Sequence, residues 1–123
     1  MKRIVISIMI IAYAFSSFAQ SKFDYVNVKE YGAKADGKSD DTQAIQRALD
    51  AAVKKGGICF LPSGNYRLNG SLFVPVGVTL KGSNDGVPHS SHPIGTVLHI
   101  YGGKNNAFAA PAISLKSNAS VKN

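Results

Sequence analysis

Apolar side chains recur at helical spacing between residues 42 and 55. They form one stripe of an amphipathic helix, made of Ala44, Ile45, Ala48, Leu49, Ala52 and Val53. Ser39 or Asp40 precedes this stripe and suits the N-cap position, and Gln43 lies at the capping-box spacing from Asp40. Gly56 and Gly57 end the pattern. The stretch therefore predicts a single, well-bounded helix.

Short apolar runs follow the helix and alternate with turn residues. Each run has the length and the β-branched or aromatic content of a strand. The predicted strands are Ile58–Leu61, Tyr66–Leu68, Leu72–Val74, Val78–Lys81, Thr96–Tyr101 and Ala112–Leu115, and a short extended piece, Tyr25–Val28, precedes the helix. Two polar, turn-rich segments, Gly82–Gly95 and Gly102–Pro111, are predicted as loops. Because no helices separate the strands, the pattern favours stacked β-coils over βαβ units.

A long stretch around the helix resembles a known family. It reads Asn27-Val28-x-x-Tyr31-Gly32-Ala33-x-x-Asp36-Gly37-x-x-Asp40-Asp41-Thr42-x-Ala44-Ile45-Gln46, and the similarity continues through Gly56–Tyr66 and Val78–Gly82. The pattern is similar to the start of the pectate-lyase-like superfamily, which includes rhamnogalacturonase- and epimerase-like members and relatives of family 28 glycoside hydrolases. The resemblance implies a mainly β fold, the start of a right-handed, single-stranded parallel β-helix with an N-terminal capping α-helix.

This resemblance gives the predicted helix a physical role. The end of a parallel β-helix presents unpaired backbone groups and an apolar interior, which a covering element must shield. We expect Ile45, Leu49 and Val53 to face that interior. Burying three such side chains contributes on the order of 5–8 kcal/mol before entropy is counted. A Leu49→Asp substitution is therefore expected to destabilise the fold more than any loop substitution.

Residues 1–19 have the pattern of a signal peptide. Lys2 and Arg3 precede the apolar run Ile4–Phe15, which is too short to cross a bilayer comfortably, and Ser17-Phe18-Ala19 offers small residues for cleavage. An uncleaved N-terminal anchor is the alternative. We expect a secreted or periplasmic protein with no stable membrane span after cleavage. Residues 20–123 would form the N-terminal cap and first coils of an incomplete, truncated β-helix domain, because solenoids need several stacked repeats.

The sequence has 123 residues, a formal net charge of +7 and one cysteine. The basic residues are scattered without a run or an aromatic-interleaved stripe, so we expect no nucleic-acid partner. Long-range attraction to an acidic polysaccharide is one interpretation of this charge, and an ordinary solubilising surface is the other. Cys59 lies within an apolar run and is interpreted as a buried structural thiol.

Asp36, Asp40 and Asp41 form the tightest acidic cluster. One interpretation is functional, a calcium site or a pair of catalytic carboxylates. The other is structural, a loop turn followed by a helix N-cap. Their spacing does not match an EF-hand, which needs glycine at the sixth position and glutamate at the twelfth. The turn and cap explain the acids without a ligand, so we expect no metal site.

His89 and His92 are three residues apart in a predicted loop and are the candidate substrate-binding residues. A zinc site would need further ligands of suitable type. His99 alternates with apolar residues and is expected to face the surface of a strand. Aromatic side chains could stack on sugars, but Phe60 and Tyr66 lie in predicted strands and are interpreted as packing residues, as is Phe73.

Function follows only from the resemblance. It implies that this chain is the N-terminal fragment of an exported polysaccharide-active β-helix protein. The whole protein would be a pectin- or rhamnogalacturonan-type hydrolase or lyase, and the fragment would be inactive by itself. The polysaccharide partner would be acidic or plant-type. No residue of this chain is assigned a catalytic role and no cofactor is expected in it, although a complete lyase-type relative could use calcium. The alternative is a non-catalytic carbohydrate-binding or structural module, such as an adhesin or a tailspike-like stem, and oligomeric state is left open.

Overall fold

The computed structural model describes residues 24–84 and 95–122. Within them the fold is mainly β, with short strands and a single α-helix. The elements are β1 (Val26–Asn27), the 3-10 helix η1 (Val28–Tyr31), β2 (Asp36–Asp40), α2 (Thr42–Ala52), β3 (Ile58–Leu61), β4 (Gly64–Leu68), β5 (Leu72–Val74), β6 (Thr79–Gly82), β7 (Thr96–Ile100), β8 (Ile113–Leu115) and β9 (Ser120–Lys122). No helix in these residues has the length and apolarity that a membrane crossing needs.

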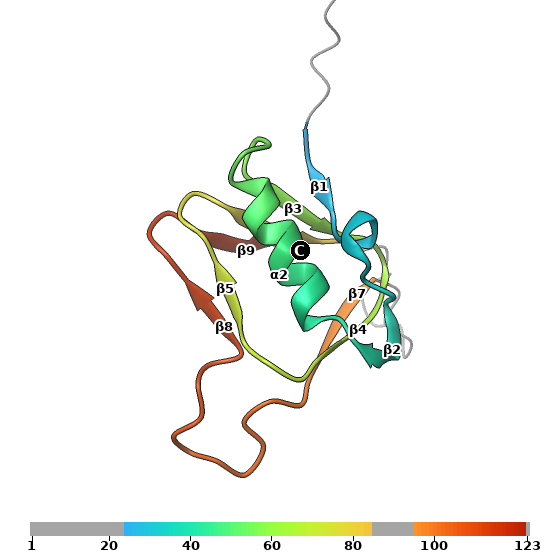
Figure 1. Ribbon diagram of the computed structural model, residues 1–123, viewed down its shortest axis with the longest axis vertical. Helices are drawn as coiled ribbons and strands as arrows, with labels where there is room; N and C mark the ends of the chain where they lie inside the picture. The colour runs from blue at the N-terminus through green and yellow to red at the C-terminus, as the bar shows by residue number, and fades with distance from the viewer. Residues whose placement is uncertain (1–23, 85–94, 123) are drawn as a thin grey trace, which may run out of the picture.

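The strands form three sheets, and every pairing between named strands is parallel. Sheet A has the order β1-β3-β6-β9, sheet B the order β2-β4-β7, and sheet C contains β5 and β8. The chain visits the three sheets in turn, first through β3, β4 and β5 and then through β6, β7 and β8. In the view of Figure 1, α2 is drawn in front of the coils, within the outline that the three sheets form. This arrangement is consistent with the start of a parallel β-helix.

The core lies between the three sheets and is built from alternate residues of each strand. In sheet A, Val26, Cys59 and Leu80 lie directly opposite one another on successive strands, and each is at most 2% exposed. Tyr66 of sheet B is fully buried, and its hydroxyl donates a hydrogen bond to the carbonyl oxygen of Pro62 at 2.8 Å. The predicted packing role of Tyr66 is therefore confirmed.

The predicted helix is confirmed, with one correction at its C-terminal end. The buried side chains of α2 are Thr42, Ala44, Ile45, Ala48, Leu49 and Ala52, and the helix contacts β1, β3 and β5. Val53 was expected on the same face, but it lies beyond the last helical residue and is 55% exposed. Burial of the two remaining large side chains, Ile45 and Leu49, therefore contributes only on the order of 3–6 kcal/mol before entropy.

The N-terminus of α2 also differs from the prediction. Asp41 occupies the N-cap position, whereas Ser39 lies within β2, and the expected capping box with Gln43 is wrong because Asp40 lies one residue too early. Asp40 instead accepts a hydrogen bond from the backbone N–H of Thr42, the first helical residue, at 3.1 Å. The Asp41 side chain makes no capping bond to the helix and is only 1% exposed.

Two strands were not predicted, because neither carries an apolar pattern. β2 has the sequence Asp-Gly-Lys-Ser-Asp and pairs with β4, with Asp36 opposite Asn65 and Asp40 opposite Arg67. β9 pairs with β6 through three consecutive residues. The other strands match the prediction to within one or two residues, and no strand forms between residues 102 and 111, as expected.

Candidate functional site

The acidic cluster is held by backbone N–H groups. Asp36 accepts hydrogen bonds from the N–H groups of Lys38 at 2.9 Å and Ser39 at 2.8 Å, and these bonds lower the pKa of Asp36 to about 2. Asp41 turns back along the chain and accepts from the N–H groups of Lys34 at 2.8 Å and Ala35 at 3.0 Å. These contacts support the turn interpretation, because the carboxylate oxygens already serve the backbone.

The other sequence candidates are spread apart. His89 and His92 lie outside the described residues, so their expected substrate contact stays a prediction. His99 is exposed on β7, as expected, with its Nε2 atom 3.0 Å from Oδ1 of Asn65. Cys59 is fully buried, and burial raises the pKa of its thiol to about 12, which confirms a buried thiol. No group of three or more His, Cys, Asp or Glu side chains that could hold a metal occurs among the described residues.

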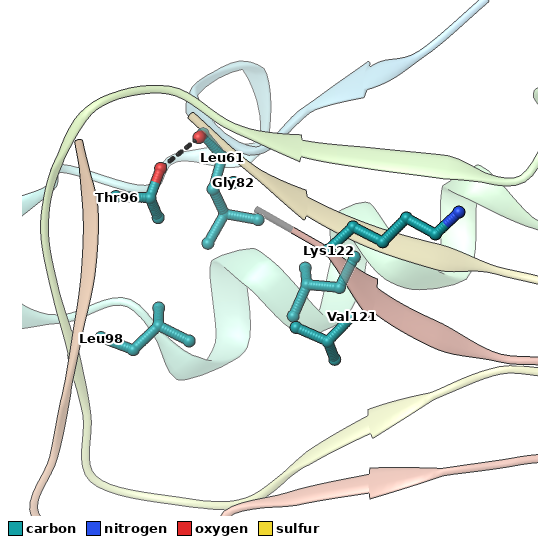
Figure 2. Close-up of a pocket in the computed structure, with 7 residues that line it drawn as sticks. Leu61, Gly82, Thr96, Leu98, Val121 and Lys122 are labelled. Atoms are coloured by element: carbon teal, nitrogen blue, oxygen red, sulfur yellow. Dashed lines mark hydrogen bonds between the residues drawn. The ribbon is translucent and has the colours of Figure 1, made fainter. Parts of the chain in front are cut away.

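A pocket of about 150 Å³ lies inside the coils, between sheets A and B (Figure 2). Its lining is mainly apolar and consists of Leu61, Leu80, Gly82, Thr96, Leu98, Val121 and Lys122. The one hydroxyl, that of Thr96, donates to the carbonyl oxygen of Leu61 at 2.7 Å and accepts from the N–H of Ser83 at 2.8 Å. Because this polar group is already satisfied, the pocket has the character of core space and not of a polar ligand site.

Sheet A presents a second, outward surface, which we call the outer face of sheet A. The alternation of its strands buries Val26, Cys59 and Leu80 and turns the intervening residues outward. The outward residues are Tyr25, Asn27, Ile58, Phe60, Thr79, Lys81, Ser120 and Lys122. They combine aromatic, amide, hydroxyl and ammonium groups on one surface.

A pocket of about 330 Å³ lies on this outer face, lined by Tyr25, Ile58, Phe60 and Lys81. The rings of Tyr25 and Phe60 meet edge to face, with 5.5 Å between centroids and 77° between planes. Phe60 was predicted to pack, and it packs half-buried against Tyr25, but on the outside of the sheet, because it alternates along the strand with inward-facing Cys59 and Leu61. Phe73, in contrast, is 51% exposed.

The outer face of sheet A carries two lysines in register. Phe60 lies opposite Lys81, and Lys81 lies opposite Lys122 on the next strand. The strands of sheet A contain no acidic residue that could offset these two cations. After residue 50 the sequence has one acidic residue, Asp85, against the basic residues Lys54, Lys55, Arg67, Lys81, Lys104, Lys116 and Lys122. The part of the chain after residue 50 thus carries an excess of positive charge that favours anionic ligands.

Sheet B carries a different polar cluster on its outside. The guanidinium group of Arg67 lies over the Tyr101 ring at 4.4 Å from the centroid, and its Nε donates to Oδ1 of Asn69 at 2.9 Å. This cation is therefore already engaged by an aromatic face and an amide. Compared with Arg67, the lysines of sheet A are more available to a ligand.

Sequence reasoning missed the outer face of sheet A, although one signal was present. The alternation in Ile58-Cys59-Phe60-Leu61 places Phe60 on the face opposite to Cys59. The neighbours of Phe60 could not be found in this way, because Tyr25, Lys81 and Lys122 join it only through strand register.

Parallel sheets that the chain enters in a fixed order define a coil-forming β protein. The chain belongs to the family described as rhamnogalacturonase A/epimerase, pectate lyase-like, which matches residues 25–108. Three similar proteins come from Azotobacter vinelandii. Alginate lyase 7 is 54% identical over 59 residues, covering 47% of this chain and 7% of that protein. The mannuronan C5-epimerase AlgE4 is 37% identical over 110 residues, covering 77% and 20%, and AlgE3 is 35% identical over 107 residues, covering 75% and 6%.

The chain thus spans a fifth or less of the length of these relatives. No solved structure matches it.

Proposed function

We propose that this chain forms the first coils of an exported β-helix protein that acts on an acidic polysaccharide. The observation that carries this proposal is the family match over residues 25–108, together with 35–54% identity to proteins named for alginate and mannuronan. Mannuronan is a polymer of a uronic acid, so an acidic substrate agrees with the excess of basic residues in the coils.

The relatives also refine the expected reaction. Their names favour elimination or C5 epimerisation of an alginate-type uronan over hydrolysis of pectin or rhamnogalacturonan. Both reactions start with removal of the proton next to the uronate carboxylate, so they require a cation at that carboxylate and a base at the carbon. We assign the base to coils outside this chain, and we expect this chain alone to bind without turnover.

We infer that α2 caps the first coil of a right-handed β-helix. In the later coils, a strand of sheet B is followed by a strand of sheet C: β4 by β5, and β7 by β8. In the first coil, β2 of sheet B is followed by α2 instead, so the helix takes the place of a strand of sheet C. The side chain of Gln46 supports this inference, because it accepts from the N–H of Phe73 at 2.9 Å and donates to the carbonyl oxygen of Phe73 at 3.0 Å. The amide side chain thus satisfies the edge of β5 as a neighbouring strand would.

We also propose that residues 1–19 direct export, which places the protein in the periplasm or outside the cell. This segment lies outside the described residues. N-terminal sequencing of the protein recovered from the culture medium or periplasm tests the proposal. A start at Gln20 is expected, and a start at Met1 would contradict it.

The polysaccharide function is tested with the purified full chain and three polymers: alginate, pectin and neutral mannan. Affinity electrophoresis measures binding. Unsaturated product measures elimination, the ratio of C5 epimers measures epimerisation, and new reducing ends without unsaturation measure hydrolysis. We expect retardation by alginate and no turnover. Turnover by this chain alone would refute the assignment of catalysis to other coils, stronger retardation by pectin would refute the alginate assignment, and no retardation by any polymer would refute the polysaccharide function.

A parallel assay separates an enzyme from a binding or structural module. The native protein, captured from its source with an antibody against this chain, is supplied with the same polymers. Turnover of alginate is expected, and binding without turnover would favour the adhesin-like alternative.

A further inference from the structure

We propose that the outer face of sheet A is a binding site for consecutive uronate units of an anionic polysaccharide, with Lys81 and Lys122 holding carboxylates and Phe60 supporting a sugar ring. This inference rests on the proposed function and assigns it to particular residues. It is carried by the register of sheet A, by the pocket beside Phe60 and by the unbalanced charge of the two lysines.

The register sets the spacing of the contacts. Phe60, Lys81 and Lys122 lie directly opposite one another on β3, β6 and β9. Neighbouring strands are about 4.8 Å apart, so the two ammonium groups start from positions separated by that distance along the axis of the coils. This spacing is comparable with the length of one pyranose unit in a 1,4-linked chain. A uronan lying along the axis would place successive units at the levels of the two strands, and the flexible stems of the lysines would let their ammonium groups reach carboxylates on either edge of the polymer.

The pocket supplies the apolar contact that a sugar ring needs. Its volume of about 330 Å³ lies at the lower end of the range of 300–1,000 Å³ that is typical of small-molecule sites. The edge-to-face arrangement of Tyr25 and Phe60 places two ring surfaces, 77° apart, beside Lys81. A pyranose ring can place its C–H groups against an aromatic face while its carboxylate reaches the ammonium group.

The charge of this face points to an anion. Like charges directly opposite one another on paired strands are destabilising. Lys81 and Lys122 are such a pair, and the strands of sheet A offer no carboxylate to separate them. A bound polyanion would remove this repulsion and gain two ion pairs. A nucleic acid is a poorer match than a uronan, because nucleic-acid sites cluster many lysines and arginines on one face, whereas the strands of sheet A carry two lysines.

Isothermal titration calorimetry of the full chain tests the site with a mannuronate hexamer, and a mannose hexamer serves as the neutral match. Lys81→Gln and Lys122→Gln remove the cations singly and together. Lys38→Gln is the matched control, since Lys38 is an exposed strand lysine on sheet B and its loss changes the net charge equally. Melting curves followed by circular dichroism verify that each variant is folded.

We expect the mannuronate affinity to fall by roughly 1.5- to 5-fold for each lysine and by roughly 2- to 25-fold for the pair, as for exposed ion pairs. The dependence of affinity on salt should flatten in the double variant. Lys38→Gln should change the affinity by less than about 1.5-fold. The unliganded double variant should melt no lower than the wild type, because removing the two lysine charges removes only the repulsion between them.

Each contrary outcome has a distinct meaning. Full mannuronate affinity in the double variant would overturn this site and leave the proposed function standing. No binding of mannuronate by the wild-type chain would overturn both. Equal affinity for the mannose hexamer would overturn the role of the lysines. Equal binding of a single-stranded DNA oligomer, with the same dependence on Lys81 and Lys122, would overturn the assignment to uronates and indicate a general polyanion surface.

Discussion

Replacing Gln46 tests how the helix is joined to the sheets. Its side-chain amide makes two hydrogen bonds to the backbone of Phe73 on β5, with its Oε1 accepting from N–H and its Nε2 donating to the carbonyl oxygen. The same Nε2 also lies 3.1 Å from Oδ1 of Asp50. A Gln46→Ala variant removes all of these contacts and leaves the helix backbone intact, since alanine and glutamine have similar helix propensities.

The expected loss is about 1–2 kcal/mol. A typical intramolecular hydrogen bond contributes about 1 kcal/mol net, and the two bonds to Phe73 are close to solvent, so water replaces part of what is lost. Gln43 provides the control, because it is exposed on the same helix. Gln43→Ala should change the free energy of unfolding by no more than about 0.5 kcal/mol, as is usual for surface substitutions.

Urea unfolding followed by circular dichroism measures both variants, and Gln46→Glu adds a pH-dependent readout. At neutral pH the introduced carboxylate can still accept from the N–H of Phe73, but it faces the carbonyl oxygen without a proton to donate. This contact raises the carboxyl pKa in the folded state above its unfolded value. The destabilisation is therefore present above the folded pKa and lessens as the pH falls through that pKa, because the protonated acid donates as the amide does.

The reasoning would be refuted if Gln46→Ala and Gln43→Ala lost the same stability. It would also fail if Gln46→Glu, measured relative to wild type, showed no recovery as the pH was lowered. Either result would mean that the side-chain amide does not satisfy the edge of β5, and the capping proposal would then rest on apolar burial alone.

Three further predictions concern single positions. Leu49→Asp should cost more than the roughly 2–5 kcal/mol typical of truncating a buried leucine, because it also buries a carboxylate, whereas Val53→Asp should be nearly neutral; equal losses in urea unfolding would contradict the observed helix face. The lowered pKa of Asp36, about 2, contributes stability that is fully present above the unfolded pKa near 4 and is lost as the pH falls toward 2. Acid titration should therefore destabilise the wild type more than Asp36→Asn, and parallel curves would count against the turn contacts. The thiol of Cys59 should resist a thiol reagent at neutral pH until denaturant is added, because it is buried and its pKa is raised to about 12; rapid labelling of the folded protein would show that the core opens.

The local sequence was sufficient where burial follows a simple period. The stripe from Ala44 to Ala52 predicted the helix, and the apolar runs at Ile58–Leu61 and Leu72–Val74 predicted two strands at the observed residues. Lone Cys59 was correctly placed inside. These predictions are correct because buried apolar side chains recur along the sequence with the period of the helix or strand that carries them.

Contacts between coils were decided only by the tertiary structure. β2 is a strand although its sequence is polar, because β4 pairs with its backbone and most of its side chains need no burial. Asp41 became a buried acceptor for two N–H groups of a preceding loop, which no helix-capping rule predicts. Tyr25, Phe60 and Lys81 form one surface because parallel register brings β3 and β6 beside β1, which Tyr25 immediately precedes.

The sequence by itself thus determined which segments are helix or apolar strand and to which family the chain belongs, since both depend on local patterns. Only the tertiary structure decided which side chains meet on the outer face of sheet A and how Gln46 joins β5. The physical reason is that the pattern of one strand sets only which of its faces is buried. Which residues of other strands it meets depends on the partner strands, on the turns between coils and on the backbone hydrogen bonds that hold the register.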